Sequence, residues 1–122
     1  MKTVICDYAE IIRFDLVDEN GIPTVGSTFF KINPTRSISF SETTNFTEGN
    51  ASIDQVLTFS SLSVDWGDLK SGDYVQVKFS VSDGTEYLFG TKDPENPAQL
   101  VINSNEGVYS VSVIRNATEK LL

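Results

Sequence analysis

The most constraining feature of this sequence is a period of two in its apolar residues, which recurs in short runs along the chain. The clearest run is Val75, Val77, Phe79 and Val81. Such alternation places apolar side chains on one face of a β-strand. About seven or eight short strands with frequent turn signals and little helix predict an all-β fold, an antiparallel β-sandwich or barrel.

One hairpin can be predicted down to its register, because only one turn length keeps its apolar residues on one face. A three-residue turn at 82–84 sets Phe79 opposite Tyr87 and Val77 opposite Phe89. It also places the glycine of that turn in the left-handed conformation that such loops require. A two-residue turn would move the aromatic rings to the opposite face, so the three-residue turn is predicted.

Similar patterns predict the remaining elements. On the strand at 6–16, the even positions from Cys6 to Leu16 are expected to share one apolar face. The polar stretch Thr43–Asn50 is expected to be a loop, and one short helix or helical turn is expected near 63–70, capping the core. The tail from Asn116 is expected to be helical or frayed. The other predicted strands are 28–33, 36–42, 51–59, 98–102 and 109–113.

Length and charge limit the organisation and the partners of the chain. Its 122 residues and 39% hydrophobic content are consistent with a single β domain spanning residues 1–122. Nine Lys and Arg residues against 17 Asp and Glu residues give a net charge of −8. An acidic surface repels phosphate, so neither direct tight nucleic-acid binding nor an anionic membrane surface is expected.

Residue types needed for common catalytic chemistry are missing. The sequence has no His and a single Cys, Cys6. A serine–histidine triad, a cysteine–histidine pair and a zinc site are therefore excluded, and Cys6 is expected to be a buried structural thiol. We accordingly expect no enzymatic activity, no cofactor and no bound metal.

Carboxylates are the remaining reactive groups. Glu10 falls on the predicted apolar face of its strand, where burial would raise its pKa. The alternative is that Glu10 lies at a strand end or edge, or pairs with Lys or Arg. Two acidic clusters, 15–20 and 93–96, have calcium-type ligands but lack the alternating spacing of a calcium loop, so they are interpreted as acidic turns.

Four aromatic residues are candidates for an assembly interface: Phe29, Phe30, Trp66 and Tyr74. Phe29 and Phe30 are adjacent in a predicted strand, so one ring must point away from the core face. Trp66 and Tyr74 flank the expected helical cap. An outward ring can contact a partner subunit or a sugar, or it can lie beneath the cap or a second sheet, and both alternatives stay open.

The C-terminal third carries a resemblance to a known class of proteins. The segment Tyr87–Pro97, preceded by Gly72–Val77 and the 82–84 turn, resembles small tail or virion structural proteins of phages and prophages in Bacteroidetes-type bacteria. The resemblance covers mainly residues 72–102. It implies a structural protein that acts by self-association or by docking to other virion proteins, and it supplies no catalytic residues.

The first hypothesis is therefore a non-enzymatic virion or phage-tail component that works as an oligomer. In that setting, a ring of acidic subunits would keep a DNA-conducting lumen from binding its cargo. The alternatives are a monomeric carbohydrate-binding β-sandwich and a hydrolase that uses paired carboxylates. The N-terminal apolar run is interrupted by Asp7 and is too short for a signal peptide. We expect the chain to be cytoplasmic at synthesis and part of the virion afterwards.

Overall fold

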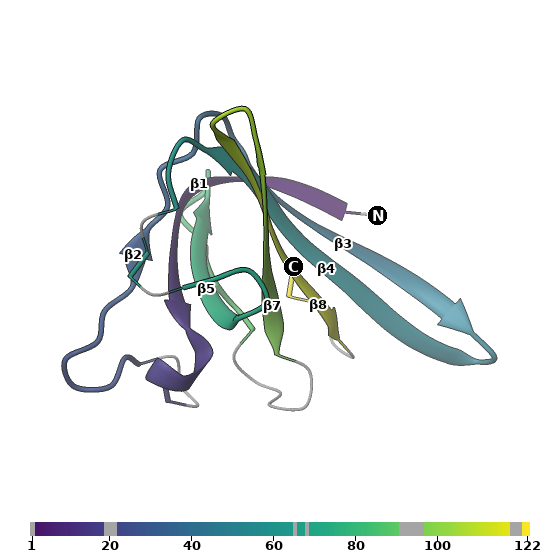
Figure 1. Ribbon diagram of the computed structural model, residues 1–122. Helices are drawn as coiled ribbons and strands as arrows, with labels where there is room; N and C mark the ends of the chain where they lie inside the picture. Colours follow the sequence, from purple (N-terminus) through teal and green to yellow (C-terminus); the bar gives the residue numbers. More distant parts are fainter. Residues whose placement is uncertain (1, 19–21, 65, 68, 91–96, 118–120) are drawn as a thin grey trace.

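The computed structural model describes residues 2–18, 22–64, 66–67, 69–90, 97–117 and 121–122, and it confirms the all-β prediction. Eight strands and one 3₁₀ turn, η1, follow one another along the described chain (Figure 1). Their bounds are β1 Lys2–Arg13, η1 Phe14–Leu16, β2 Phe30–Lys31, β3 Ile38–Thr47, β4 Asn50–Ser61, β5 Tyr74–Val81, β6 Glu86–Phe89, β7 Ala98–Asn105 and β8 Val108–Ala117.

All eight strands belong to one antiparallel sheet that closes partly into a ring. The strand order is β2-β1-β3-β4-β8-β7-β5-β6, and β5 pairs a second time with β1. The first part of β1, residues 2–6, pairs with β3, and the later part pairs with β5. Because β1 contacts both neighbours in turn, it is the strand that closes the sheet.

The interior of the ring is filled by alternate residues of these strands. Phe40, Phe79 and Phe89 are almost completely buried there. The ring centroid of Phe40 lies 4.9 Å from that of Phe79 and 5.1 Å from that of Phe89. Tyr87 stacks on Phe79 at 5.3 Å. These aromatic contacts, together with aliphatic residues from every long strand, form the main hydrophobic core.

The hairpin predicted around residues 82–84 forms with the predicted register. Val77 pairs with Phe89 and Phe79 pairs with Tyr87. Gly84 has a φ of 87°, the left-handed conformation that the three-residue turn requires. The three-residue turn keeps the apolar residues of both strands on the buried face, which confirms the prediction made from their alternation.

The prediction for the first strand is wrong beyond Cys6, because β1 contains a bulge. The register shifts between Cys6 and Tyr8, which moves the side chains of the main core cluster from even to odd positions, whereas Ile12 is buried outside that cluster. Ala9 and Ile11 consequently face the core, while Tyr8 is exposed. A bulge adds one residue to the alternation and bends the strand, and here it marks the point where β1 leaves β3 and joins β5. The segment Phe14–Leu16 forms the 3₁₀ turn instead of continuing the strand.

The predicted loop at Thr43–Asn50 is also wrong. These residues form the end of β3 and the start of β4, which run out together as a hairpin beyond the rest of the sheet, at the lower right of Figure 1. The predicted strand at 28–33 is shorter than expected, since only Phe30 and Lys31 pair with β1.

The helical cap expected near 63–70 is not present in the described residues of that segment. They form an irregular loop, in which the N–H of Trp66 donates to the carbonyl of Val64 (3.0 Å) and the N–H of Leu69 donates to the carbonyl of Trp66 (3.4 Å). The loop still covers the core, because Trp66 packs edge-on against Phe59 at 5.7 Å. A single large ring therefore covers the core where we expected a helix.

In the part of the chain that the structure describes, no helical segment has the length and apolar character needed to cross a bilayer.

Candidate functional site

The most distinctive feature of the surface is the outer part of the β3–β4 hairpin, residues 43–52, which we call the arm. Pairing of β3 with β1 ends at Glu42, and pairing of β4 with β8 begins at Ile53. Among the described residues, neither edge of the arm pairs with another strand. At about 3.4 Å per residue, the arm extends roughly 17 Å beyond the β1 pairing along β3 (residues 43–47) and roughly 10 Å beyond the β8 pairing along β4 (residues 50–52).

Local sequence explains why the arm forms strands despite its polarity. Its two strands are joined by a two-residue turn, Glu48-Gly49, with φ values of 51° and 81°. Positive φ at both turn positions is the geometry that matches the twist of antiparallel strands. Thr43 and Thr44 are β-branched and favour an extended backbone. The glycine and the threonines were available as signals, but no apolar alternation accompanied them.

One face of the arm continues the face of β3 and β4 that forms the core inside the ring. Successive pairs on this face are Phe40 with Leu57, Glu42 with Gln55, Thr44 with Ile53, and Phe46 with Ala51 near the tip. Phe46 is 77% exposed. This face is buried inside the ring of strands, but it extends past the core in the arm. The side chain of Phe46 is therefore an exposed apolar group that is available to a partner.

The boundary between ring and arm is a buried polar network centred on Glu42. Gln55 donates from Nε2 to Oε2 of Glu42 (2.7 Å). The backbone N–H groups of Leu121 and Leu122 donate to the same carboxylate at 2.6 and 2.9 Å. Arg115 donates from Nη1 to Oε1 of Gln55 (3.3 Å). The network closes this end of the core and holds residues 121–122 against it.

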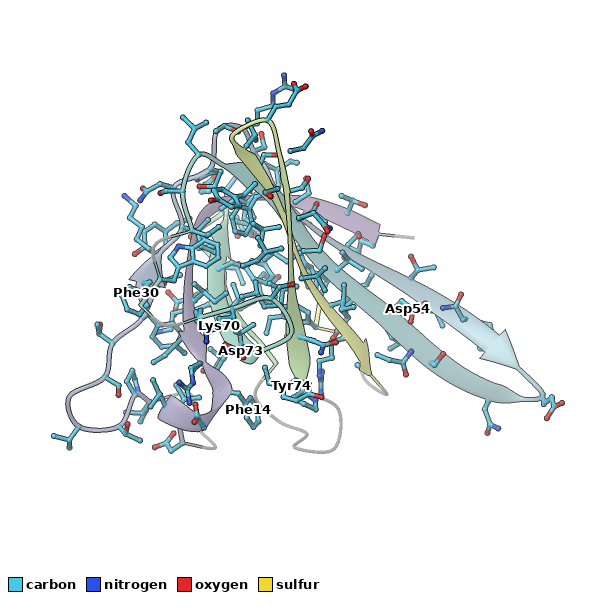
Figure 2. The ribbon with its side chains drawn as sticks, in the orientation of Figure 1. Phe14, Phe30, Asp54, Lys70, Asp73 and Tyr74 are labelled. Atoms are coloured by element: carbon cyan, nitrogen blue, oxygen red, sulfur yellow. The ribbon has the colours of Figure 1, made fainter. Side chains whose placement is uncertain are left out.

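The opposite face of the hairpin is fixed at its base by Asp54 (Figure 2). Asn45 donates to Oδ2 of Asp54 at 2.6 Å, and Asn116 of β8 donates to Oδ1 at 2.8 Å. These contacts connect the arm to β8. The arm is therefore held in direction on one face, while the Phe46 face is open.

The four aromatic residues predicted as an interface do not form one surface. Trp66 is 4% exposed and belongs to the core. Phe29 and Phe30 are half-buried: Lys78 Nζ lies 4.8 Å from the ring centroid of Phe29, and Phe30 packs against the core. Tyr74 is 53% exposed and lies well apart from Phe30 in Figure 2. Trp66 is therefore a core residue that belongs to the covering loop itself, and an assembly role for the other three stays a prediction.

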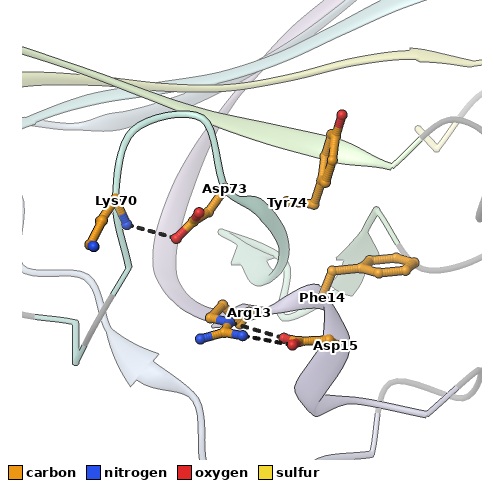
Figure 3. Close-up of a pocket in the computed structure, with 6 residues that line it drawn as sticks. All are labelled: Arg13, Phe14, Asp15, Lys70, Asp73 and Tyr74. Carbon is orange, nitrogen blue, oxygen red and sulfur yellow. Dashed lines mark hydrogen bonds and ion pairs between the residues drawn. The ribbon is translucent and has the colours of Figure 1, made fainter.

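Tyr74 borders a hollow of about 420 Å³ between β5 and the end of β1 (Figure 3). The hollow is lined by Arg13, Phe14, Asp15, Lys70, Asp73 and Tyr74. Arg13 holds Asp15 through two bonds, from Nε to Oδ1 (3.0 Å) and from Nη2 to Oδ2 (2.7 Å). The hydrogen bonds and charge of Arg13 lower the pKa of Asp15.

That hollow bears on the paired-carboxylate hypothesis, because Asp15 and Asp73 both line it. Glycoside hydrolysis needs one carboxyl that stays protonated as a general acid, with a raised pKa. The pKa of Asp15 is lowered, which suits an ionised group. The hydrolase hypothesis stays a prediction.

Glu10 lies in the polar surroundings that were the alternative to burial. It is half-buried, accepts a hydrogen bond from the Tyr8 hydroxyl (3.0 Å), and stands in register with Lys31 on β2 and Lys78 on β5. In the acidic cluster at 15–20, Asp18 accepts the backbone N–H of Ile22, which is a turn contact. Residues 19–20 and 93–96 lie outside the described residues, and no metal-holding cluster occurs among the described ones.

Two further buried polar groups differ in their hydrogen bonding. Gln76 is completely buried on β5, and neither its Nε2 nor its Oε1 has a hydrogen-bond partner. Gln55 is equally buried, and both ends of its amide are hydrogen-bonded.

Cys6 is buried as expected, and desolvation, with a smaller contribution from Asp7, raises the pKa of its thiol to about 12.

Exposed carboxylates are scattered over the described surface. Glu48 is at the tip of the arm, Asp15 is in η1 and Glu106 is in the β7–β8 turn, three corners that are far apart in Figure 1. These three described carboxylates do not share one face, so they do not support the idea of an acidic lumen.

Comparisons with known proteins found no match for this chain among family models, curated sequences or solved structures.

Proposed function

We propose that this protein is a non-enzymatic assembly protein that joins to a second copy of itself through the arm. The observation that carries the proposal is the pair of strand edges in residues 43–52 with which no described residue pairs, together with the exposed ring of Phe46. Unpaired backbone N–H and C=O groups on such edges are templates for strand addition.

The composition of the arm supports this reading. Exposed edges are usually guarded against pairing by Lys, Pro or a bulge. Residues 43–52 contain no Lys, no Arg and no Pro, and the β3–β4 register runs through them without a shift. Added strands would gain main-chain hydrogen bonds, and Phe46 would supply the apolar contact that fixes their register.

The same chain also offers edges that can accept an arm. β2 and β6 lie at the two ends of the strand order. An arm that pairs with an end strand of the next copy makes a head-to-tail contact, which closes into a ring or extends into a filament according to the rotation between copies. Self-association of this geometry is therefore possible without any other protein.

Net charge sets the conditions under which association is strongest. Copies that each carry −8 repel one another at long range. Salt screens this repulsion beyond the Debye length, which is about 10 Å at 0.1 M salt and about 3 Å at 1 M salt. The arm contains one charged residue, Glu48, and no Lys or Arg. Its contact with a second copy should therefore depend little on ion pairs. Association should thus strengthen, and not weaken, as salt rises.

The setting of the assembly is part of the same proposal. The resemblance of residues 72–102 to phage-tail and virion structural proteins favours a virion component. In a virion, the arm would also have neighbouring virion proteins within reach as docking partners.

The test is solution mass by size-exclusion chromatography with light scattering, from roughly 5 to 500 μM protein, at low and high salt. We expect a concentration-dependent increase in mass that grows with salt. Phe46→Ser should shift the chain back to monomer at every concentration. Leu62→Ser, which removes an equally exposed apolar side chain elsewhere (69% exposed), is the matched control and should associate like the wild type.

A monomer at every concentration and salt would contradict self-association. Association that persists in Phe46→Ser, or that is lost in both variants, would contradict the role of the arm.

A further inference from the structure

Tyr74 stands between two surface hollows, and this arrangement carries an inference independent of the arm. The first hollow, of about 420 Å³, lies toward η1 and the 70–73 turn. The second, of about 540 Å³, lies over β4, β7 and β8 and includes Gln99, Ile114 and Asn116. Tyr74 lines both and is 53% exposed. One aromatic ring is thus available to ligand groups in each hollow.

The walls of the first hollow are held in place by backbone hydrogen bonds. The N–H of Lys70 donates to Oδ2 of Asp73 (2.9 Å), and the N–H of Asp73 donates to the carbonyl of Lys70 (3.1 Å). Two further bonds connect this turn to β7. The N–H of Gly72 donates to the carbonyl of Leu100 (2.7 Å), and the N–H of Leu100 donates to the carbonyl of Asp73 (2.9 Å). The opposite wall is fixed by the two bonds between Arg13 and Asp15 (Figure 3). A preformed site costs a ligand less ordering entropy on binding.

The charges that line the first hollow are balanced. Two cations, Arg13 and Lys70, face two carboxylates, Asp15 and Asp73. Because Arg13 and Asp15 already neutralise each other, the lining favours neither an anion nor a cation. It does present several hydrogen-bond donors and acceptors to a ligand with hydroxyl groups.

The aromatic lining gives the apolar part of the recognition. In Figure 3, the rings of Phe14 and Tyr74 stand on the same side of the hollow, across from the Lys70–Asp73 turn. Binding sites combine such apolar surfaces with a few placed polar groups. A pyranose ring has the matching chemistry, since its C–H face packs on an aromatic ring while its hydroxyls reach polar side chains.

We propose that the two hollows on either side of Tyr74 form a binding site for a neutral saccharide chain, with one sugar unit in each hollow. The second hollow supplies further amide and aliphatic groups from Gln99, Asn116 and Ile114. The two hollows share only Tyr74, so a chain of at least two units is needed to contact both.

The test is a titration followed by amide NMR shifts, with cellotriose, maltotriose and triacetylchitotriose as probes, each to roughly 20 mM. We expect at least one to give saturable shifts in both the 70–74 and the 99–116 amides, with a Kd on the order of 1 mM. Tyr74→Ala, at an exposed position, should weaken binding at least about tenfold with the fold intact. Phe46→Ser should bind like the wild type, which separates this site from the arm.

Three outcomes would overturn the proposal. One is the absence of saturable shifts with all three trisaccharides. Another is that sodium acetate or a diamine produces the same shifts at lower concentration, which would mean that the hollow selects charge. Binding that survives Tyr74→Ala unchanged would also contradict the assignment.

Discussion

The β5–β6 and β3–β4 hairpins have related turns but opposite surroundings. Both use a glycine with positive φ, Gly84 at 87° and Gly49 at 81°. In β5–β6, one face packs into the core, and Phe79 is completely buried. In the arm, the face that carries Phe46 is open, and Phe46 is 77% exposed. The comparison teaches that burial stabilises the first hairpin, whereas the second is held by its turn and by the strands that continue into it.

This difference bears directly on the proposed function. A two-stranded hairpin without a packed face is marginally stable in water. The arm is kept extended because β3 and β4 are anchored in the ring, by Phe40 and Leu57 in the core and by Asp54 at the base. It therefore presents its edges while contributing little to the fold. Substitutions in the ring and in the arm should separate stability from association.

The largest expected difference is between the phenylalanines of the two hairpins. Phe79→Ala removes a ring that contacts Phe40 and Tyr87, and it should lower the free energy of unfolding by about 3–5 kcal/mol. Phe46→Ala should change it by less than about 0.5 kcal/mol, because the ring is exposed. Urea unfolding of dilute monomer, followed by circular dichroism, measures both. Similar losses in the two variants would mean that the arm is part of the folded core.

Glycine substitutions give a second contrast, smaller than the first. A Cβ on Gly90 would lie 2.9 Å from the Cβ of Ala98 and 3.0 Å from the carbonyl oxygen of Val75, in addition to a φ of 97°. At Gly49 a Cβ meets nothing within 4 Å. Gly49→Ala should thus cost only the conformational strain of about 1–2 kcal/mol, and Gly90→Ala should cost more. Thermal melts of both variants test this, and equal costs would show that the strands around Gly90 move apart freely.

Replacing each of the two buried glutamines by leucine should change the free energy of unfolding in opposite directions. Gln76→Leu removes an amide with no hydrogen-bond partner, so it should be neutral or stabilising by about 1 kcal/mol. Gln55→Leu leaves the Glu42 carboxylate and Arg115 without that amide, and should cost about 1–3 kcal/mol. Urea unfolding at neutral pH is again the measurement. Destabilisation by Gln76→Leu would indicate that the amide of Gln76 is satisfied in solution.

At neutral pH, where its thiol stays protonated, Cys6 is expected to have the smallest effect on stability. Burial raises its pKa from 9.0 to about 12, so the folded chain holds this proton more tightly than the unfolded chain. Its contribution to stability is present below pH 9 and is lost as the pH rises toward 12. At pH 8, a disulfide reagent should label Cys6 roughly a thousandfold more slowly than a free thiol. Ala51→Cys in the arm should add one thiol that reacts at the free rate, and fast labelling of Cys6 itself would contradict its burial.

The sequence was informative wherever a face is buried on a regular strand. The pairing of Val77 with Phe89 followed from alternation, because a slip of one residue would expose the apolar set. The same reasoning failed at Asp7, since a bulge changes the phase of alternation without any change in composition. It failed again near 63–70, where the spacing of Trp66 was compatible with a helix but one ring in an irregular loop covers the core.

The candidate sites were less predictable than the fold. The sequence of the arm is mostly polar, apart from Phe46 and Ala51, and its residues are also those of loops, so only Gly49 and the threonines indicated a hairpin. Tyr74 was singled out by its residue type. The hollows beside it depend on bringing η1, the 70–73 turn and β8 together, which local patterns do not encode.

The most direct test of the central claim is hydrogen exchange by mass spectrometry at low and high protein concentration. The account predicts that peptides covering residues 43–52 exchange fast in dilute protein and become protected as concentration rises, while peptides of β5 and β8 are protected throughout. Phe46→Ser should abolish the gain in the arm. An arm that exchanges equally fast at every concentration, in a sample whose mass increases, would place the interface elsewhere and contradict the account.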